Sequence, residues 1–435
     1  MAAERVLGVL ARGEAAGCGI AAWSLHFSET RRVTLGTQDR ETGNAHAPLT
    51  ITDGLIVRYR LVWSDGKVSR GAIERRAAES EPEAAIAAAR AAAYVDPDAT
   101  EVCGPSVFAE IATHDPEAAA IADGAVEPFA PRLAAIRERV ESGRFRTWSG
   151  AMHAAVGASR VITSAGLDVA GGGTSAGWSA SLDGEMGMGH AARGLEPVPE
   201  FERRLDRLVA FVLALGSPAP PRPGGIVPVL LHPDVVDDYA LAALLHNLDG
   251  VQVAHGTGAF RRSQFGSGVP VLREDLTLRN DPHRPMAAGA YRFTQEGVPS
   301  RACAYIERGR LITPLLDLKY ARRLGLPPAP GPAALDTVFL EGPERIPYDE
   351  ALGRCAGGAL VLNVLGIHTQ DLTSGDFSLS APQMLAVGPH GIEGRLRGTI
   401  SGNLFDLLRS KDLALVDFPG EHTPGLLVGC RLDPA

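Results

Sequence analysis

The first half of the chain alternates between stretches patterned as helices and stretches patterned as strands. Ala-rich composition or apolar residues at helical spacing predict helices over residues 4–15, 83–94, 117–122, 131–142 and 200–215. In the last of these, Phe201, Leu205 and Leu208 fall on one face, and Arg204 lies off it. This helix is therefore expected to be amphipathic.

Strand-like runs fill the gaps between these helices. The runs 55–64 and 68–74 flank a strong turn signal, Asp65-Gly66-Lys67, and predict a β-hairpin. Residues 152–169 and 177–182 predict two further strands, linked by a glycine-rich bend. The first half is therefore expected to form an amino-terminal α/β sandwich-like domain with a mixed sheet.

A stiff, polar segment, Ser217–Gly225, separates this half from the second. Its prolines and its lack of apolar periodicity are typical of an interdomain linker. We therefore expect an amino-terminal domain over residues 1–216, a linker over 217–225 and a carboxyl-terminal domain over 226–435.

The second half begins with a buried strand over 226–232 and a helix over 235–246. Short alternating runs follow, among them 302–306 and 310–313, and turn sequences join them. These runs predict a mainly antiparallel β domain with few helices, built as a sheet or as an open barrel. The whole chain is therefore expected to be α+β, with two domains.

Charge and composition narrow the classes of partner. The formal net charge is -9 and no run of Lys or Arg offsets it, so nucleic acid is not expected as a partner. No stretch of about 18 uninterrupted apolar residues is present, so no membrane span is expected. The amino terminus is unlike a signal peptide, and the five cysteines form no C-x-x-C pair: Cys18, Cys103, Cys303, Cys355 and Cys430. These features favour a reducing, cytoplasmic location.

Segments of the second half resemble a known family. Gly366–Ser380 and Gly391–Leu408 resemble signature segments of the TldD/PmbA family, in its TldE (PmbA) branch. Gln295–Arg301 resembles the family's D-E-G-V-P-T element, and the resemblance is strongest over residues 226–430. It implies that the chain is the subunit without zinc of a heterodimeric TldD/TldE-type metallopeptidase. Its TldD-like partner would carry the zinc and cleave peptides.

The family's metal motif is degenerate in this chain. Zinc-bearing members carry an H-E-x-x-x-H helix, in which two imidazoles bind the ion and the glutamate serves as general base. At the matching positions this chain has His246, Asn247 and Val251, and no H-E-x-x-x-H or H-E-x-x-H occurs in the 435 residues. A neutral amide cannot take a proton from a metal-bound water, and valine cannot bind a metal. The resemblance therefore implies no catalytic residue and no metal in this chain, with zinc expected in the partner subunit.

The role implied for this chain is supportive: it would hold an extended peptide or peptide-like substrate, by strand addition to a sheet edge, while the partner cleaves it. Proteolysis and the maturation of a peptide natural product both remain open. The alternative is a self-sufficient metal-dependent peptidase or amide hydrolase, with a site rebuilt from His246, His255, His283 and Cys430. Outside such a site, Cys430 is expected to be a small buried thiol.

Polar side chains crowd the two signature segments. His368, Ser374, Asp376, Phe377 and Asn403 are candidates to line a substrate channel or a subunit interface. The same loop composition also suits a tight turn held by its own hydrogen bonds, and phenylalanine is commonly a core residue. The sequence leaves both interpretations open.

Two glycine-rich stretches offer other chemistry. Gly173-Thr-Ser175-Ala-Gly177 matches the nucleophile-elbow pattern, but a strand pattern follows Ser175 where a helix is needed, so a flexible bend is expected. Met186, Met188 and His190 alternate and would point to one side of a strand, as a soft-metal site requires. An exposed hairpin tip is the preferred interpretation there.

Overall fold

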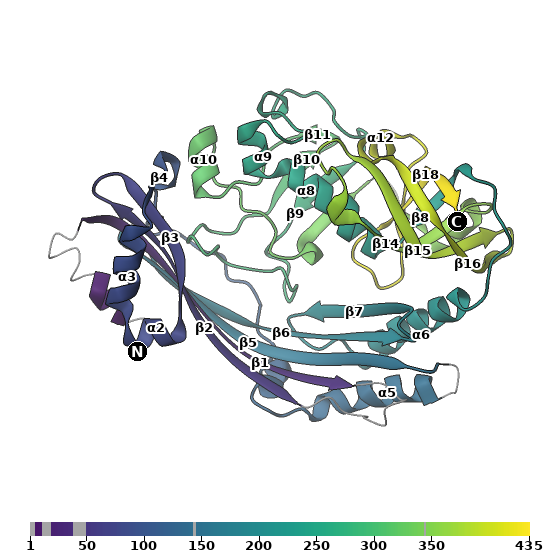
Figure 1. Ribbon diagram of the computed structural model, residues 1–435, viewed down its shortest axis with the longest axis horizontal. Helices are drawn as coiled ribbons and strands as arrows, with labels where there is room; N and C mark the ends of the chain where they lie inside the picture. Colours follow the sequence, from purple (N-terminus) through teal and green to yellow (C-terminus); the bar gives the residue numbers. More distant parts are fainter. Residues whose placement is uncertain (1–4, 11–18, 38–48, 142–144, 343–344) are drawn as a thin grey trace.

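A computed structural model describes the chain except for residues 1–4, 11–18, 38–48, 142–144 and 343–344. Figure 1 shows a long, curved sheet from the amino-terminal half beneath a body of short helices and strands from the carboxyl-terminal half. Both halves contain helices and strands, so the predicted α+β class is confirmed.

The amino-terminal sheet has seven strands in the order β4-β3-β2-β1-β5-β6-β7. The pairings between these strands are all antiparallel, so the prediction of a mixed sheet in this half is wrong. Most strands pair with their neighbours in sequence, and a tight turn between neighbours gives an antiparallel pair. The strands are β1 (Ile20–Thr37), β2 (Thr50–Trp63), β3 (Lys67–Glu74), β4 (Tyr94–Val95), β5 (Trp148–Thr163), β6 (Asp168–Leu182) and β7 (Met186–Ala192).

Helices accompany this sheet close to where the sequence predicts them: α3 (Pro82–Ala91), α4 (Pro116–Ala122), α5 (Ala130–Glu141) and α6 (Val198–Leu215). Helix α3 ends at Ala91 because residues 94–95 join the sheet as β4. Residues 5–10 are helical, and the remainder of the predicted helix 4–15 lies outside the described residues. The pattern did not predict α2 (Arg75–Ser80) or the 3₁₀ turns η1 (Pro97–Ala99) and η2 (Glu127–Phe129).

The glycine-rich run lies inside strand β6, so the predicted bend at 171–177 is wrong. These glycines let neighbouring backbone segments approach closely, and the chain does not turn at them. A Cβ on Gly172 would lie 2.6 Å from the carbonyl oxygen of Gly157, and one on Gly173 would lie 2.5 Å from that of Thr113. Ser175 therefore sits within a strand, which excludes the nucleophile elbow.

Strand β7 corrects a second expectation. Met186 and Met188 share one side of the strand, as alternation predicts, but both are buried in a hydrophobic cluster with Trp178. The hairpin turn lies before them, where Asp183 adopts a left-handed φ of 50°. These methionines are therefore core residues and not an exposed tip.

The carboxyl-terminal half contains two sheets, ordered β11-β10-β9-β12 and β13-β17-β18-β16-β15-β14-β8. An additional β18–β8 pairing closes five strands of the second sheet into a ring, where the sequence predicted a sheet or an open barrel. Most pairings are antiparallel, as predicted, and the parallel ones are β14–β8 and β13–β17. The strands are β8 (Gly225–Leu231), β9 (Thr277–Asn280), β10 (Cys303–Glu307), β11 (Arg310–Leu311), β12 (Val338–Glu341), β13 (Arg345–Pro347), β14 (Ala359–Leu365), β15 (Asp376–Gly388), β16 (Gly391–Asn403), β17 (Ala414–Asp417) and β18 (Gly425–Pro434).

The helices of this half are short. The predicted helix 235–246 is continuous but contains a π-helical segment, η3 (Val236–Leu241), between α7 (Pro233–Val235) and α8 (Ala242–Leu248). None of the helices in the described ranges is long and apolar enough to cross a membrane. The others are α9 (Gly250–His255), η4 (Arg262–Gln264), α10 (Leu318–Leu324), η5 (Leu335–Thr337), α11 (Tyr348–Arg354), η6 (Ile367–Thr369) and α12 (Leu404–Arg409).

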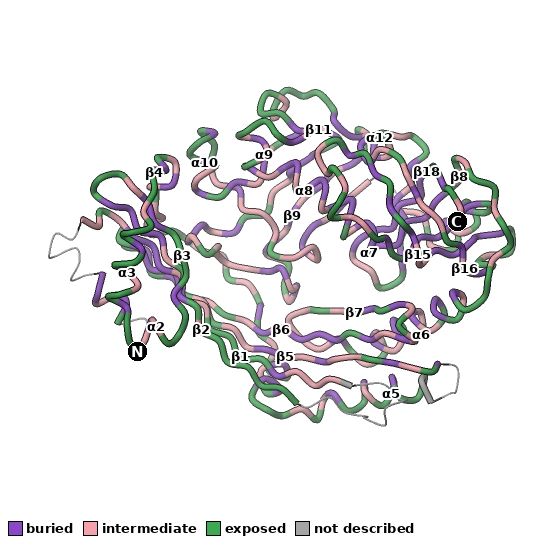
Figure 2. The backbone as a smooth tube through the Cα atoms, viewed as in Figure 1, coloured by how far each residue is buried: buried purple, intermediate pink, exposed green. Residues whose placement is uncertain are grey.

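One hydrophobic core joins the two halves of the chain. It combines Trp178 and Phe201 with Leu360 and Phe418, although residues 217–224 between them form no helix or strand. Figure 2 shows buried segments in both layers, including the strands that face each other. The division into two domains at 217–225 stays a prediction, and any such domains share this core.

A cleft beside a repurposed motif helix

A cleft lies between the amino-terminal sheet and the carboxyl-terminal body. It consists of three adjoining cavities with volumes of about 400, 180 and 640 Å³. The first and third share Tyr291 and Phe293, and the second and third share His26 and Glu296. Residues from strands near the amino terminus therefore face a carboxyl-terminal segment more than 200 positions away in sequence.

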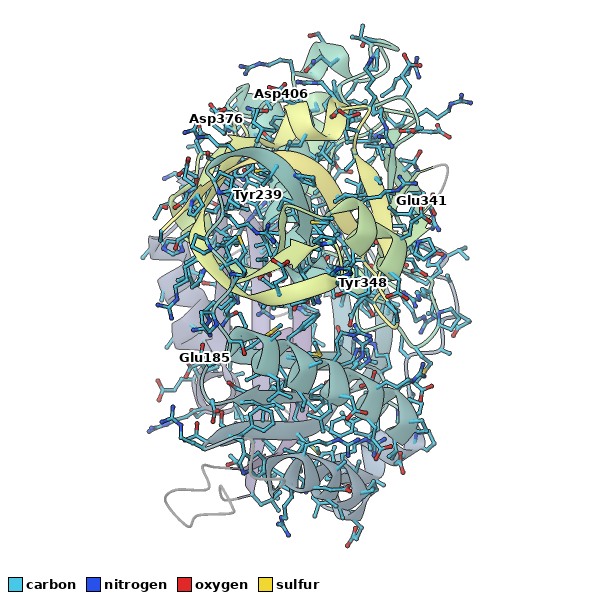
Figure 3. The ribbon with its side chains drawn as sticks, turned by 90° about the vertical axis from the view of Figure 1, so that its right-hand side faces the viewer. Glu185, Tyr239, Glu341, Tyr348, Asp376 and Asp406 are labelled. Atoms are coloured by element: carbon cyan, nitrogen blue, oxygen red, sulfur yellow. The ribbon has the colours of Figure 1, made fainter. Side chains whose placement is uncertain are left out.

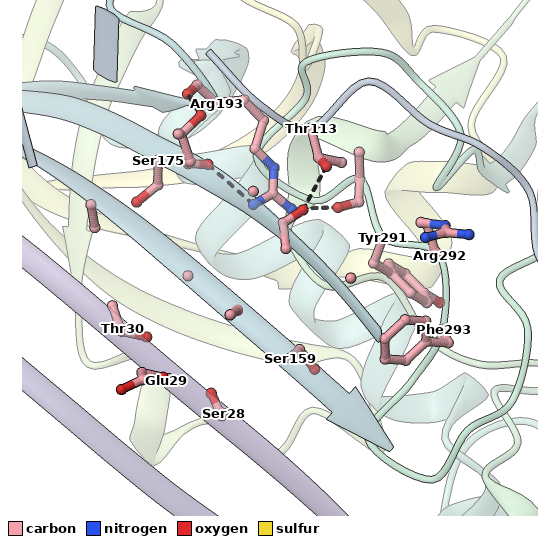
Figure 4. A pocket seen from close by; sticks show the side chains of 18 of the residues that line it. Ser28, Glu29, Thr30, Thr113, Ser159, Ser175, Arg193, Tyr291, Arg292 and Phe293 are labelled. Atoms are coloured by element: carbon pink, nitrogen blue, oxygen red, sulfur yellow. Dashed lines mark hydrogen bonds between the residues drawn. The ribbon is translucent and has the colours of Figure 1, made fainter. Parts of the chain in front are cut away.

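The sheet provides this cleft with a floor of small side chains. In β1, Ser28 and Thr30 line the first cavity, and the strand register places them opposite Ser159 and Gly157 of β5. Alternate residues of a strand share one face, so these positions form a continuous row. Figure 4 shows Ser28, Thr30 and Ser159 on neighbouring strands along one side of this cavity.

Two arginines beside the first cavity hold its wall together. Arg193 donates hydrogen bonds to the carbonyls of Ala287 over 3.1 Å and Thr174 over 3.2 Å, and also to that of Ala290. Arg292 donates to Ala109 and Ala170 and pairs with the exposed carboxylate of Glu110. Both guanidinium groups therefore join the two halves of the chain and already have partners.

His26 marks the junction of the second and third cavities. Its Nε2 lies 2.8 Å from Ser159 Oγ, and its buried Nδ1 has no hydrogen-bond partner among the described residues. Burial, followed by the neighbouring charge of Arg58, lowers the pKa of His26 below its usual value. The imidazole is therefore neutral at pH 7 and offers one unused nitrogen next to the cleft.

A buried ion pair closes the floor of the second cavity. The side chains of Arg60 and Glu296 form this pair and are 8% and 17% exposed. Glu296 also accepts a hydrogen bond from the backbone N–H of Leu318, at the start of α10, over 3.0 Å. Burial is the main cause that lowers the pKa of Arg60, to about 10. The segment resembling the family's D-E-G-V-P-T element is thus anchored to strand β2 through its acid.

Asn247, which the resemblance places at the position of the family's general base, is fully buried and fully bonded. Its amide nitrogen donates to the carbonyls of Ala243 and Leu372, and its oxygen accepts from the N–H of Ala259 over 2.6 Å. His246 is only partly buried, and its side chain makes no hydrogen bond or ion pair within the described part of the chain.

The helix is also interrupted between the motif positions. Helix α8 ends at Leu248, and Asp249 has an extended backbone with φ -59° and ψ 134°. The Asp249 carboxylate caps α9 by accepting from the N–H of Val251 over 2.7 Å. Val251 therefore belongs to a second helix, where its exposed side chain lines the third cavity. His246 and Val251 therefore lie on separate helices.

The residues of the alternative, rebuilt metal site are not brought together. His255 is exposed and contacts Tyr320, while His283 Nε2 lies 3.0 Å from Ser300 Oγ. Cys430 is buried, donates to the carbonyl of Ser401 over 3.2 Å, and has its pKa raised to about 11 by burial. Within the described part of the chain, no three His, Cys, Asp or Glu side chains are arranged to hold a metal ion.

The two signature segments meet at a turn on the rim of the strand ring, and this turn is held by its own hydrogen bonds. Asn403 donates to the carbonyl of Ser374 over 2.9 Å and to the carboxylate of Asp376 over 2.8 Å. Phe377 is buried against Tyr239, whereas His368 is exposed. Figure 3 shows Asp376 on this rim, away from the amino-terminal layer. None of these residues lines the three cavities, and their role at an interface stays a prediction.

The π-helical segment carries an acid that sequence reasoning missed. Asp237 accepts a hydrogen bond from Thr423 Oγ1 over 2.6 Å, and burial raises its pKa to about 6. A π-helical turn places this carboxylate off the regular helical stripe, and hydrophobic periodicity gives no signal for such a turn.

Comparisons with known proteins agree with this architecture. Residues 224–427 match the family described as the PmbA/TldA metallopeptidase C-terminal domain. No curated protein sequence matches the chain. The solved structure of TldE from Thermococcus kodakarensis is similar over 99% of this chain and 100% of that one, with a TM-score of 0.79 and 19% identity.

Two further solved structures share the fold. A putative modulator of DNA gyrase from Bacteroides thetaiotaomicron covers 100% of this chain and 98% of its own, at a TM-score of 0.78 and 16% identity. A protein with the same description from Thermotoga maritima is similar over 99% of this chain and 100% of its own, with a TM-score of 0.76 and 21% identity. At these identities the likeness establishes the fold of the whole chain.

Proposed function

This chain belongs to the TldD/PmbA family through its carboxyl-terminal domain and has a TldE-like fold, and we propose that it is the non-catalytic subunit of a heterodimeric TldD/TldE-type metallopeptidase. In this proposal a TldD-like partner holds the zinc, whose role is to activate the water that cleaves the peptide. This chain helps to bind the substrate and to enclose it.

One observation carries the proposal: Asn247 is committed to three hydrogen bonds in a fully buried site. An acid at this position would have to be solvent-accessible or beside a metal to act as a base. The break at Asp249 supports the same conclusion, because it removes Val251 from the helix that carries His246. The helix of the degenerate motif serves packing in this chain.

The cleft supports a role in holding substrate. All three cavities include residues of strand β1, so an extended segment of peptide has a continuous floor on which to lie. The same cleft serves peptide breakdown and peptide maturation. The four described cysteines are all free, which supports the cytoplasmic location included in the proposal.

The test is co-expression of the full chain with its TldD-like subunit, followed by size-exclusion chromatography with light scattering. We expect a stable complex of the two chains, with peptide cleavage faster in the complex than in the partner alone. A monomeric chain beside a partner whose activity is unchanged by mixing would overturn the proposal.

A further inference from the structure

Three arginines of the cleft have no ionic partner among the described residues. Arg32 lines the first cavity, and Arg58 and Arg70 line the second. All three residues are exposed, and none of their side chains makes a hydrogen bond or a salt bridge within the described ranges. They differ in this respect from Arg193 and Arg292, whose guanidinium groups are fully engaged. The cleft therefore holds three positive charges available to a ligand.

Strand register places these charges at two ends of the cleft floor. Arg58 of β2 lies opposite His26 of β1, and Arg70 of β3 lies opposite Arg60 of β2. Arg58 and Arg70 therefore form one end, where β1, β2 and β3 run side by side. Arg32 lies six residues along β1 from His26, on the same face by alternation. At about 3.4 Å per residue, the two ends are separated by roughly 20 Å.

The floor between the two ends consists of small side chains, several of which carry hydroxyl groups. Ser28 and Thr30 lie between His26 and Arg32 on this face, opposite Ser159 and Gly157. A peptide lying here would meet small side chains along its length and positive charge at both ends. An extended chain of about six residues covers the same distance.

The positive charges of these arginines also act on neighbouring titratable groups. After burial, the charge of Arg58 is the next cause that lowers the pKa of His26, and Arg32 acts in the same way on His153. After burial, Arg70 is likewise the next cause that lowers the pKa of Arg60. Asp317 acts on Arg60 in the opposite sense, so its carboxylate offsets part of the positive charge at this end.

The opposite wall favours a peptide over a nucleic acid. It is built from Tyr291, Phe293 and Tyr320, which suit apolar side chains. It also carries Asp249 and Asp317, which cap helices α9 and α10. These carboxylates would repel a nucleic acid, which carries a negative charge on every nucleotide. A peptide whose acidic side chains all face the sheet would avoid this repulsion.

We propose that the cleft binds an extended acidic peptide, with carboxylates paired to Arg58 and Arg70 at one end and to Arg32 about six residues away at the other. This inference rests on the proposed function and gives its substrate class: peptides whose acidic residues are spaced to reach both ends. The small residues between the arginines would accommodate the intervening backbone.

The test measures binding of the purified full chain, without a partner, to fluorescently labelled peptides by anisotropy. One peptide carries glutamates about six residues apart, a second has glutamine at those places, and a third has adjacent glutamates. We expect the first to bind about tenfold or more tightly than the second and more tightly than the third, with the advantage lost at high salt.

Matched variants assign the effect to the cleft. The triple variant R32Q, R58Q and R70Q is expected to lose the preference for the acidic peptide. The control triple R31Q, R76Q and R137Q removes the same charge from exposed positions outside the three cavities and should retain it. Arg31 is the immediate neighbour of Arg32 and points to the opposite face of β1.

Three results would overturn the inference: equal affinity for the glutamate and glutamine peptides, unchanged preference in the cleft triple, or tighter, arginine-dependent binding of an oligothymidylate of equal charge. Because the assay needs no partner, its failure is distinct from a failure to form the heterodimer. A complex that forms and cleaves, without acidic preference in the cleft, would remove this inference alone.

Discussion

The side-chain amide of Asn247 donates a hydrogen bond to the main-chain carbonyl of Leu372 over a distance of 2.7 Å. Helix α8 is thereby fastened to the signature segment that starts at Gly366, although the two are separated by more than 100 residues. The side chain needs an amide for this role, because only an amide can donate to two carbonyls while also accepting from the N–H of Ala259.

Substituting Asn247 should destabilise the fold without creating a metal site. In N247D a carboxylate would be buried and would lose both donated bonds, so we expect a loss of roughly 3 kcal/mol or more in the free energy of unfolding. Urea unfolding measures it. The neighbouring H246A, at a partly exposed position, is the matched control and should cost below about 1 kcal/mol. Equal stability of N247D and the unchanged chain would contradict the structural role.

Breaking the buried Arg60–Glu296 pair should lower the free energy of unfolding much more than breaking the exposed Arg292–Glu110 pair. In E296Q, Arg60 would remain buried without a balancing charge, and a loss of roughly 2–4 kcal/mol is expected. The control is E110Q, which breaks the Arg292–Glu110 pair at a carboxylate that is 86% exposed, and it should cost less than about 1 kcal/mol. Similar costs for the two variants in chemical denaturation would show that burial of the first pair is unimportant.

Asp237 should make the fold less stable as pH rises. Its pKa is raised to about 6 in the folded state from a model-compound value of 3.8, so the folded state binds more protons between these values. Stability from this group is present at low pH and declines as pH rises through about 6. D237N should therefore be more stable than the unchanged chain at about pH 8, by on the order of 1–2 kcal/mol, and similar to it near pH 4. Thermal unfolding at both pH values measures the difference, and a pH-independent difference would contradict it.

Binding of the acidic peptide should strengthen as pH falls. The pKa of His26 is lowered in the free chain by burial and by Arg58, and a bound carboxylate would offset that charge and raise it. Binding then takes up a proton, so affinity increases between about pH 7.5 and 5.5, as long as the peptide carboxylates stay ionised. The measurement is anisotropy across this range. H26Q should bind with a much flatter pH profile, and a profile identical to that of the unchanged chain would exclude His26.

Much of the fold could be predicted from local pattern. The apolar stripe on α6 and the turn signal between β2 and β3 are short-range features, and both are found as predicted. Arg204 was expected off the buried face of α6 but is itself buried, because it pairs with Glu196 and Glu421. The glycine run in β6 led to the wrong prediction of a bend, because glycine permits both a turn and close contact between strands. The contacts with Gly157 and Thr113, which are distant in sequence, decide between the two. The π-helical segment before α8 has no recognised sequence signal.

The cleft could not be predicted because it joins distant segments. His26 and Glu296 line the same cavities, and nothing in either local sequence indicates this. The alternation of Ser28, Thr30 and Arg32 in β1 was a usable signal for a polar sheet face. The net charge of the chain gives no indication that Arg58 and Arg70 line one cavity, or that their side chains have no ionic partner among the described residues.

The most direct test of the account measures zinc by elemental analysis and peptide cleavage in three samples: this chain alone, the TldD-like subunit alone and the co-purified pair. We predict that this chain alone holds no stoichiometric zinc and cleaves nothing, and that the pair holds zinc and cleaves peptide. Stoichiometric zinc with cleavage by this chain alone, lost in H246A, would contradict the assignment of a non-catalytic subunit.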